Sequence, residues 1–122
     1  FKYIKNKELS DVVAKSEISL NILRKQNHTS HNMRTFEITS MGGLMLTTRS
    51  KEQKKYFPEN KASLMFEDTR ELNKKIRYIL NNKNTSKKIR HRGYFLSKKH
   101  SYEQRVKSLI KYINRYEKFS NT

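Results

Sequence analysis

The sequence contains no cysteine, and this absence excludes both disulfides and thiolate metal sites. No apolar run approaches the roughly 20 residues that a membrane-spanning helix needs. The N-terminal stretch FKYIKNKELS also lacks the apolar segment of a signal peptide. These absences predict a cytoplasmic protein. The alternative is peripheral contact with the inner face of the membrane.

Acidic residues are scarce as well. The 122 residues include 11 Asp and Glu against 28 Lys and Arg, a formal net charge of +17, and 34% of the residues are apolar. This length fits one domain with a modest core. The positive excess favours an anionic partner, either nucleic acid or an acidic membrane. Lys, Asn and Ile are abundant throughout, however, which is typical of a genome-wide residue bias, so specific nucleic-acid binding is not expected.

Two phosphate-binding motifs are missing, because the chain has neither G-x-G-x-x-G nor G-K-[ST]. His28 and His31 are three residues apart, but no Cys and no nearby acid completes a metal site. We therefore predict no metal and no cofactor. The two histidines remain either polar loop residues or donors to a phosphate or a sugar hydroxyl. His91 and His100 flank a basic segment and are predicted to lie at the surface.

The first half of the chain alternates between helical and strand patterns. Gly42 and Gly43 end a helix in which Met33 and Phe36 face inward, since glycine tolerates the left-handed cap. The next strand is a continuous apolar run, which is typical of burial on both faces. The predicted elements are a helix over 8–16, a strand over 17–23, a loop over 24–31, a helix over 32–41, a strand over 44–48, a helix over 50–57 and a strand over 62–66.

Caps define the helices on either side of the last predicted strand. Ser50 and Gln53 stand in capping-box positions, and Pro58 closes the helix that they begin. Asp68 caps the following helix, TRELNKKIRYILNN, in which Leu72, Ile76, Ile79 and Leu80 share one apolar face.

The C-terminal part of the chain is predicted to be helical. Residues 85–99 form a weakly patterned helix, and Ser101 with Gln104 forms a capping box for the last one. We expect the apolar face of the last helix to pack on the sheet and its outer face to be exposed to solvent. That apolar face consists of Tyr102, Val106, Leu109, Ile110 and Ile113.

This order of elements predicts an α/β fold, a Rossmann-like three-layer parallel sheet with covering helices. Three strands make a thin sheet, whereas a complete doubly wound domain usually has five or six. We therefore expect that further strands precede Phe1 in the whole protein.

The stretch NMRTFEITSMGG contains the candidate site. Ligands of open α/β sheets bind beyond the carboxyl ends of the strands, and a helix start suits phosphate. Glu37 lies one turn inside the helix, where a carboxylate could accept two hydrogen bonds from a ribose diol, and Arg34 could contact a phosphate. The alternative is that Glu37 is a solvated helix residue paired with Arg34 at i,i+3.

The same stretch resembles a family signature. NMRTFEITSMGGLMLT is similar to bacterial glycosyltransferases of the two-domain GT-B fold, in particular the spore-maturation and cell-surface group, whose pattern is R-x-F-E-x-x-x-x-G-G before a strand. YFPENKASLMFED, DTRELNKKIRYILNN and HSYEQRVKSLIKYI are similar to later stretches of that group. The resemblance covers roughly residues 8–114.

The resemblance implies that residues 1–122 are the C-terminal, donor-binding half of a GT-B glycosyltransferase. Glu37 would hold the ribose of a nucleoside diphosphate sugar, and the N–H groups of Asn32, Met33 and Arg34 would face the diphosphate. His31 belongs to the same set, although relatives often have Gly in this loop. Many relatives carry a second Glu eight positions before the ribose-binding one, where this chain has Thr29.

The acceptor, a glycan or a lipid-linked molecule of the cell surface, and the usual catalytic base would belong to the N-terminal half of the enzyme. No catalytic residue is therefore predicted here, and the fragment alone should be inactive. The rival hypothesis is a basic α/β module that binds nucleic acid or an anionic membrane, supported by the excess of Lys and Arg from Lys83 to Lys118.

Overall fold

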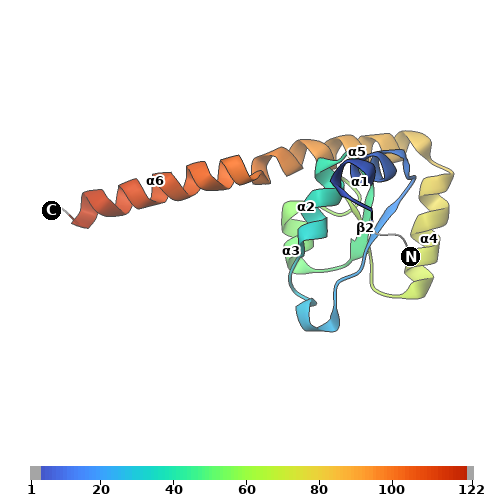
Figure 1. The fold of residues 1–122 in the computed structure, drawn as a ribbon. Helices are drawn as coiled ribbons and strands as arrows, with labels where there is room; N and C mark the ends of the chain where they lie inside the picture. Colours follow the sequence, from blue (N-terminus) through green and yellow to red (C-terminus); the bar gives the residue numbers. More distant parts are fainter. Residues whose placement is uncertain (1–3, 121–122) are drawn as a thin grey trace.

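Three parallel strands form the sheet, in the spatial order β1-β2-β3. They are β1 (Ser19–Asn21), β2 (Met45–Thr48) and β3 (Leu64–Phe66). The structure, a computed structural model, describes residues 4–120 (Figure 1). The predicted α/β fold is confirmed, and each strand lies within the segment that its sequence pattern predicted.

Helices surround this sheet and join its strands. The short η1 (Lys25–Asn27) and α2 (Met33–Ser40) lie between β1 and β2, and α3 (Lys51–Tyr56) lies between β2 and β3. The remaining elements are α1 (Asn6–Lys15), α4 (Thr69–Leu80), α5 (Lys83–Ser97), η2 (Lys98–His100) and α6 (Tyr102–Ser120). Every predicted helix is present, with boundaries that differ by a few residues.

Two apolar clusters fill the space between the sheet and its helices. One contains Leu44, Leu46, Leu64 and Phe66 from the strand segments with Ile79 of α4 and Ile89 of α5. The other contains Met45 of β2 with Val13 of α1, Ile38 of α2 and Phe57 after α3. Since successive residues of a strand point to opposite faces, β2 is buried on both sides, as its apolar run predicted.

At the edge of the sheet, β1 is only partly covered. Leu20 is 46% exposed and Ile22 is 62% exposed, whereas Asn21 and Leu23 are buried. Two other apolar residues of the predicted inner faces, Met33 and Leu80, are also exposed.

The turn from α2 into β2 depends on its two glycines. Gly42 adopts a φ of +75°, which residues with a side chain rarely adopt. A Cβ atom on Gly43 would lie 2.5 Å from the Val13 side chain and 3.0 Å from the Ile38 carbonyl oxygen. The predicted tight turn is therefore confirmed, and Gly43 also lets α1 approach α2 closely.

The predicted N-caps are confirmed, but among the described residues neither predicted capping box is completed. The Ser50 hydroxyl, the Asp68 carboxylate and the Ser101 hydroxyl each accept the N–H group three residues further on. No hydrogen bond returns from the Gln104 side chain to the Ser101 N–H in the part of the chain that the structure describes. Gln53, however, does not complete a capping box. Its side chain is buried and donates to the Thr47 hydroxyl at 2.9 Å, which ties α3 to β2.

Helix α6 differs most from the prediction, because it leaves the body of the protein instead of covering the sheet (Figure 1). Its predicted apolar face is exposed, from 46% at Ile113 to 78% at Tyr102. Ser101 is extended, with φ −62° and ψ 154°, so it interrupts the helical path between η2 and α6. Within residues 4–120, no helix is both long and apolar enough to cross a bilayer.

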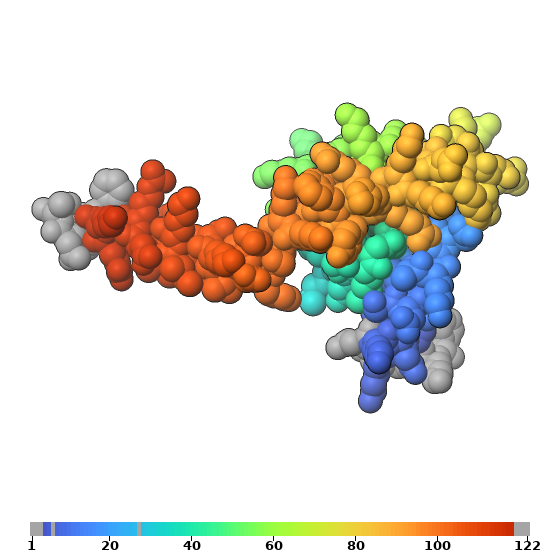
Figure 2. Space-filling model, turned by 90° about the horizontal axis from the view of Figure 1, so that it is seen from above, coloured from blue at the N-terminus to red at the C-terminus, as the bar shows by residue number. Residues whose placement is uncertain are grey.

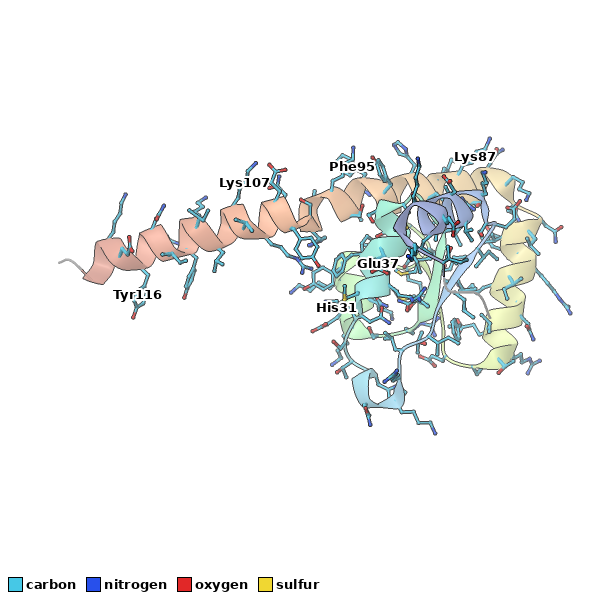
Figure 3. All side chains as sticks on the ribbon, in the orientation of Figure 1. His31, Glu37, Lys87, Phe95, Lys107 and Tyr116 are labelled. Atoms are coloured by element: carbon cyan, nitrogen blue, oxygen red, sulfur yellow. The ribbon has the colours of Figure 1, made fainter. Side chains whose placement is uncertain are left out.

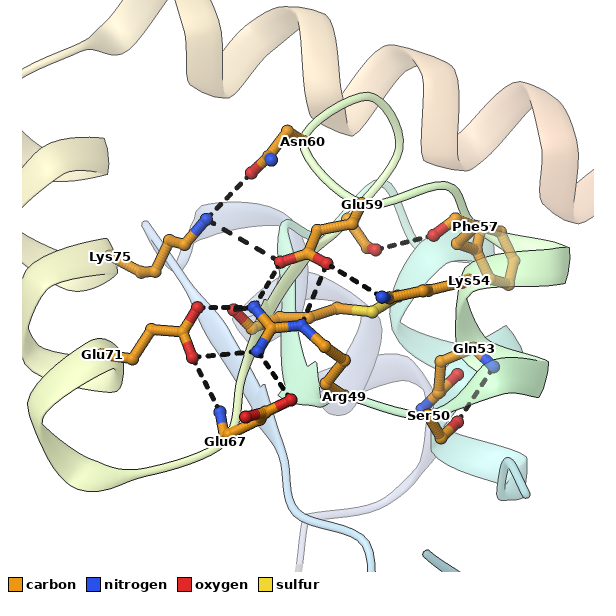
Figure 4. Close-up of polar contacts among 12 residues, drawn as sticks. Arg49, Ser50, Gln53, Lys54, Phe57, Glu59, Asn60, Glu67, Glu71 and Lys75 are labelled. Carbon is orange, nitrogen blue, oxygen red and sulfur yellow. Dashed lines mark hydrogen bonds and ion pairs between the residues drawn. The ribbon is translucent and has the colours of Figure 1, made fainter. Parts of the chain in front are cut away.

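An ionic cluster around Arg49 joins the ends of β2 and β3 to α4 (Figure 4). The guanidinium donates to Glu59 at 2.6 and 3.0 Å and to Glu71 at 2.5 and 3.0 Å. Its side chain is 19% exposed, and those of Glu59 and Glu71 are 17% and 28% exposed. Hydrogen bonds to Arg49 lower the pKa of Glu59 and hold that of Glu71 at about 2.

We predict that Glu71→Gln destabilises the fold by about 1.5–3 kcal/mol at pH 7, the usual range for a hydrogen bond to a charged group. Because the folded-state pKa of Glu71 is lowered, its stabilisation is present above its ordinary pKa of 4.5 and is lost as the pH falls toward 2. Urea unfolding at a series of pH values measures this difference.

The matched control is Glu67→Gln, since Glu67 also contacts Arg49, at 3.3 Å, but is 71% exposed. This control should change stability by less than about 0.5 kcal/mol. A Glu71→Gln protein as stable as the wild type at pH 7 would show that the cluster does not hold α4 in place.

Candidate functional site

The start of α2 is held at the carboxyl end of β1 by a pair of asparagines. Asn21, the last residue of β1, is buried and donates to the Asn32 Oδ1 at 3.0 Å. Asn32 donates in return to the Asn21 Oδ1 at 2.9 Å. This reciprocal pair fixes where the helix begins relative to the sheet.

Asn32 also closes a capping box with Thr35. Its side chain accepts from the Thr35 N–H at 3.2 Å, and its own N–H donates to the Thr35 hydroxyl at 3.4 Å. The N–H groups of Met33 and Arg34 follow in the first turn, where a helix provides no acceptor of its own. Within the described part of the chain, the N–H groups of Met33 and Arg34 have no acceptor, whereas the N–H group and side chain of Asn32 are used in the cap.

Glu37 lies one turn further along α2 (Figure 3). It is partly buried. Among the residues that the structure describes, no hydrogen bond or ion pair involves its carboxylate, and none joins it to Arg34. The predicted alternative of an i,i+3 pair with Arg34 is therefore not found in this structure.

The Glu37 side chain lines a groove of about 400 Å³, which we call the α2 groove. A second hollow of about 280 Å³ lies beside the α2 start and shares three residues with the groove. Its lining is His31, Asn32, Met33, Phe36 and Arg105. The α2 groove itself is lined by Met33, Phe36, Glu37, Ser40, Tyr94, Ser97, Lys98, His100, Ser101, Tyr102 and Arg105.

Cations and aromatic rings occupy the wall opposite Glu37. The Arg105 guanidinium lies 5.0 Å from the centroid of the Phe36 ring, and the Lys98 ammonium lies 4.6 Å from that of Tyr94. Both distances are within the range of cation–π attraction, which holds the positive groups beside the groove. Glu37 is the one acid in this lining.

His31 is fixed by contacts on the protein rather than free in its loop. Its Nδ1 contacts the Glu52 carboxylate, which lowers the pKa of Glu52, and its ring lies edge-on to Phe36 and Tyr56. His31 also lines the hollow beside the α2 start. His31 is therefore positioned as a rigid wall of that hollow.

His100 was predicted at the surface, but the structure shows it only partly exposed. The His100 ring packs against Phe36, Tyr56 and Phe57, with centroids 4.9 to 6.5 Å away. Burial lowers its pKa, and Arg105 lowers it further. His91, by contrast, is exposed as predicted.

Three other candidate residues lie outside the two hollows. Arg34 is exposed and lines neither of them. His28 and Thr29 lie near the start of α3, where the Thr29 carbonyl accepts the Glu52 N–H at 3.4 Å. Thr29 thus faces α3 and not Glu37.

Sequence patterns missed the far wall of the groove. Tyr94, Lys98 and Arg105 come from α5, η2 and the start of α6, about 60 residues after Glu37. The excess of Lys and Arg in this part of the chain was visible, but only the packing of α5 against α2 brings these residues to Glu37.

Comparison with known proteins assigns the chain to a family. No curated protein and no solved structure matches it. The model of the glycosyl transferase-like family matches residues 2–111, which is most of the chain and includes α2 and both walls of the groove. The protein thus belongs to the glycosyl transferase-like family.

Proposed function

We propose that this chain is the donor-binding half of a GT-B glycosyltransferase. It would hold a nucleoside diphosphate sugar while the sugar passes to an acceptor hydroxyl in cell-surface glycan synthesis. The observation that carries the proposal is the unpaired Glu37 carboxylate, which lines a groove one turn after the free N–H groups of α2.

The diphosphate is proposed to lie in the hollow beside the α2 start. The N–H groups of Met33 and Arg34 and the positive end of the helix dipole favour an anion there. Arg105 lines the same hollow and can add a charge-assisted hydrogen bond to a phosphate oxygen. His31 can donate or accept at the edge of this site.

The nucleoside is proposed to occupy the α2 groove. Glu37 can accept hydrogen bonds from the 2′- and 3′-hydroxyls of the ribose, and Tyr94 or Tyr102 offers an aromatic face to the base. Together the two hollows have the size that small ligands usually need.

Sugar transfer builds negative charge on the departing diphosphate. Helix N–H groups and the Arg105 guanidinium, which lines the hollow, would stabilise that charge as the bond to the sugar breaks. The base that deprotonates the acceptor and the acceptor site itself, for a glycan or a lipid-linked molecule, are assigned to an N-terminal half. We place this reaction in the cytoplasm.

Completion of the sheet fits the same proposal. Leu20 and Ile22 on the β1 edge are exposed, whereas parallel strands are normally buried on both faces. Further strands of the whole enzyme, pairing with β1, would cover these two side chains.

We predict that Glu37→Gln weakens the binding of a nucleoside diphosphate by about 1.5–3 kcal/mol, the usual range for a hydrogen bond to a charged group. This is roughly tenfold to over a hundredfold in Kd. Calorimetric titration of the two-domain enzyme measures it. The stability of the fold should change little, because the side chain faces the groove.

Deoxynucleotides test whether the contact is with the ribose. A 2′-deoxy or 3′-deoxy diphosphate should bind the wild type more weakly but should bind Glu37→Gln about as well as the normal ligand. Glu8→Gln, on exposed α1, is the control and should behave as the wild type. If removal of a ribose hydroxyl weakens binding to the wild type and to Glu37→Gln by the same factor, Glu37 does not contact the ribose.

A second prediction concerns the isolated chain. The purified 122 residues should bind a nucleoside diphosphate but transfer no sugar, because the acceptor site and the base are assigned to the other half. Transfer is measured with a radiolabelled donor sugar. Turnover by this chain alone would contradict the assignment of the two halves.

A further inference from the structure

We propose that the outer face of α5 and α6 is a docking surface for an anionic phospholipid bilayer. We call this face the basic ridge. The inference goes beyond donor binding and does not depend on it. The ridge consists of Lys88, His91, Phe95 and Lys99 on α5 and η2, and of Lys107, Lys111 and Lys118 on α6.

The charge of this part of the chain is almost entirely positive. No acid occurs between residues 72 and 102, and residues 83–118 contain 12 Lys and Arg against the two acids Glu103 and Glu117. Glu103 contacts the Lys107 ammonium at 2.6 Å. More than half of the net charge of +17 is therefore concentrated on α5, η2 and α6.

The ridge residues lie on the side of α5 opposite its buried side. Ser86, Ile89, Gly93 and Ser97 face the body, and a Cβ atom on Gly93 would lie 2.9 Å from the Ala62 carbonyl oxygen. The side chains of Lys88, His91, Phe95 and Lys99 are three or four residues apart and exposed.

The same side continues along α6. Lys87, Phe95 and Lys107 point away from the body on one side of the molecule, and Tyr116 points the opposite way (Figure 3). Seen from that side, α5 and α6 form one continuous surface (Figure 2). Helices of 15 and 19 residues placed end to end extend for roughly 50 Å.

Not every cation of this region is available to a partner. Arg90 donates to the carbonyl oxygens of Ala14 and Glu17 at 3.1 and 2.9 Å, and Lys83 contacts the Glu17 carboxylate at 2.5 Å. These two residues hold the end of α1 and are not part of the ridge.

An exposed aromatic ring favours a bilayer as the partner of the ridge. Phe95 is 49% exposed, and the Arg92 guanidinium and the Lys99 ammonium each lie 5.7 Å from its ring centroid. An apolar ring flanked by cations suits the headgroup level of a membrane.

The test is sedimentation of the chain with vesicles of phosphatidylcholine in which about a third of the lipid is phosphatidylglycerol, a negative surface that attracts basic segments. The ridge variant is Lys88→Gln, Lys99→Gln, Lys111→Gln and Lys118→Gln together, and it leaves out Lys107 because Glu103 already pairs with it. It should lower the partition coefficient roughly a hundredfold or more, because each Lys near such a surface contributes about fivefold.

The matched control removes the same charge elsewhere. Lys7→Gln, Lys15→Gln, Lys25→Gln and Lys61→Gln together change four exposed lysines outside the ridge, and this variant should retain most of the binding. Phe95→Ser should weaken binding at high salt. Salt screens the attraction between the lysines and the anionic headgroups, but it does not screen the apolar contact of the ring. Circular dichroism checks that all the variants fold.

Three results would overturn the proposal. The first is an equal loss of vesicle binding in the ridge and control variants. The second is equal binding of the wild type to vesicles of phosphatidylcholine alone. The third is loss of binding in the double variant Leu109→Gln with Ile113→Gln, whose residues lie on the opposite side of α6. Tighter binding to duplex DNA than to the vesicles at physiological salt would instead assign the ridge to nucleic acid.

Discussion

Burial of the central strand β2 on both faces is the constraint from which the arrangement of the helices follows. Leu44, Met45, Leu46 and Thr47 are fully buried, so each face of the sheet needs its own helical cover. α4 and α5 cover one face, and α1 and α2 cover the other. This packing brings the start of α2 to the carboxyl end of β1, and α5 beside α2.

Polar contacts fix this arrangement at the carboxyl edge of the sheet. The Asn21–Asn32 pair sets the start of α2, and Arg49 joins the ends of β2 and β3 to α4. Because buried polar groups are costly without partners, these contacts permit few alternative positions of the helices. The α2 groove is thus built from rigid elements, while the carboxylate of Glu37 is left unpaired within it.

Local patterns in the sequence predicted most of the fold. The caps at Ser50 and Asp68, the turn at Gly42 and Gly43, and the apolar run of β2 each depend on neighbouring residues, and all are confirmed. Interactions between distant residues were not predictable in this way. Arg49 meets Glu59 and Glu71 only because two parallel strands end side by side.

The same difference applies to the site. Glu37 was found from a local motif, but Tyr94, Lys98 and Arg105 reach it only through the packing of α5 on α2. The periodicity of α6 correctly predicted an amphipathic helix. Periodicity does not specify which element covers the apolar face, and the expected packing on the sheet is wrong. The extended Ser101 turns that helix away from the sheet.

The most direct test of donor binding at the α2 start is an NMR titration of the 122-residue chain with a nucleoside diphosphate. The amides of Met33 and Arg34 should shift most, because they would donate to the diphosphate. The amide of Glu37 and the side chain of Arg105 should shift at the same ligand concentration. If saturating nucleotide leaves the α2 amides unchanged and shifts only the lysines of the basic ridge, the proposed donor site is contradicted.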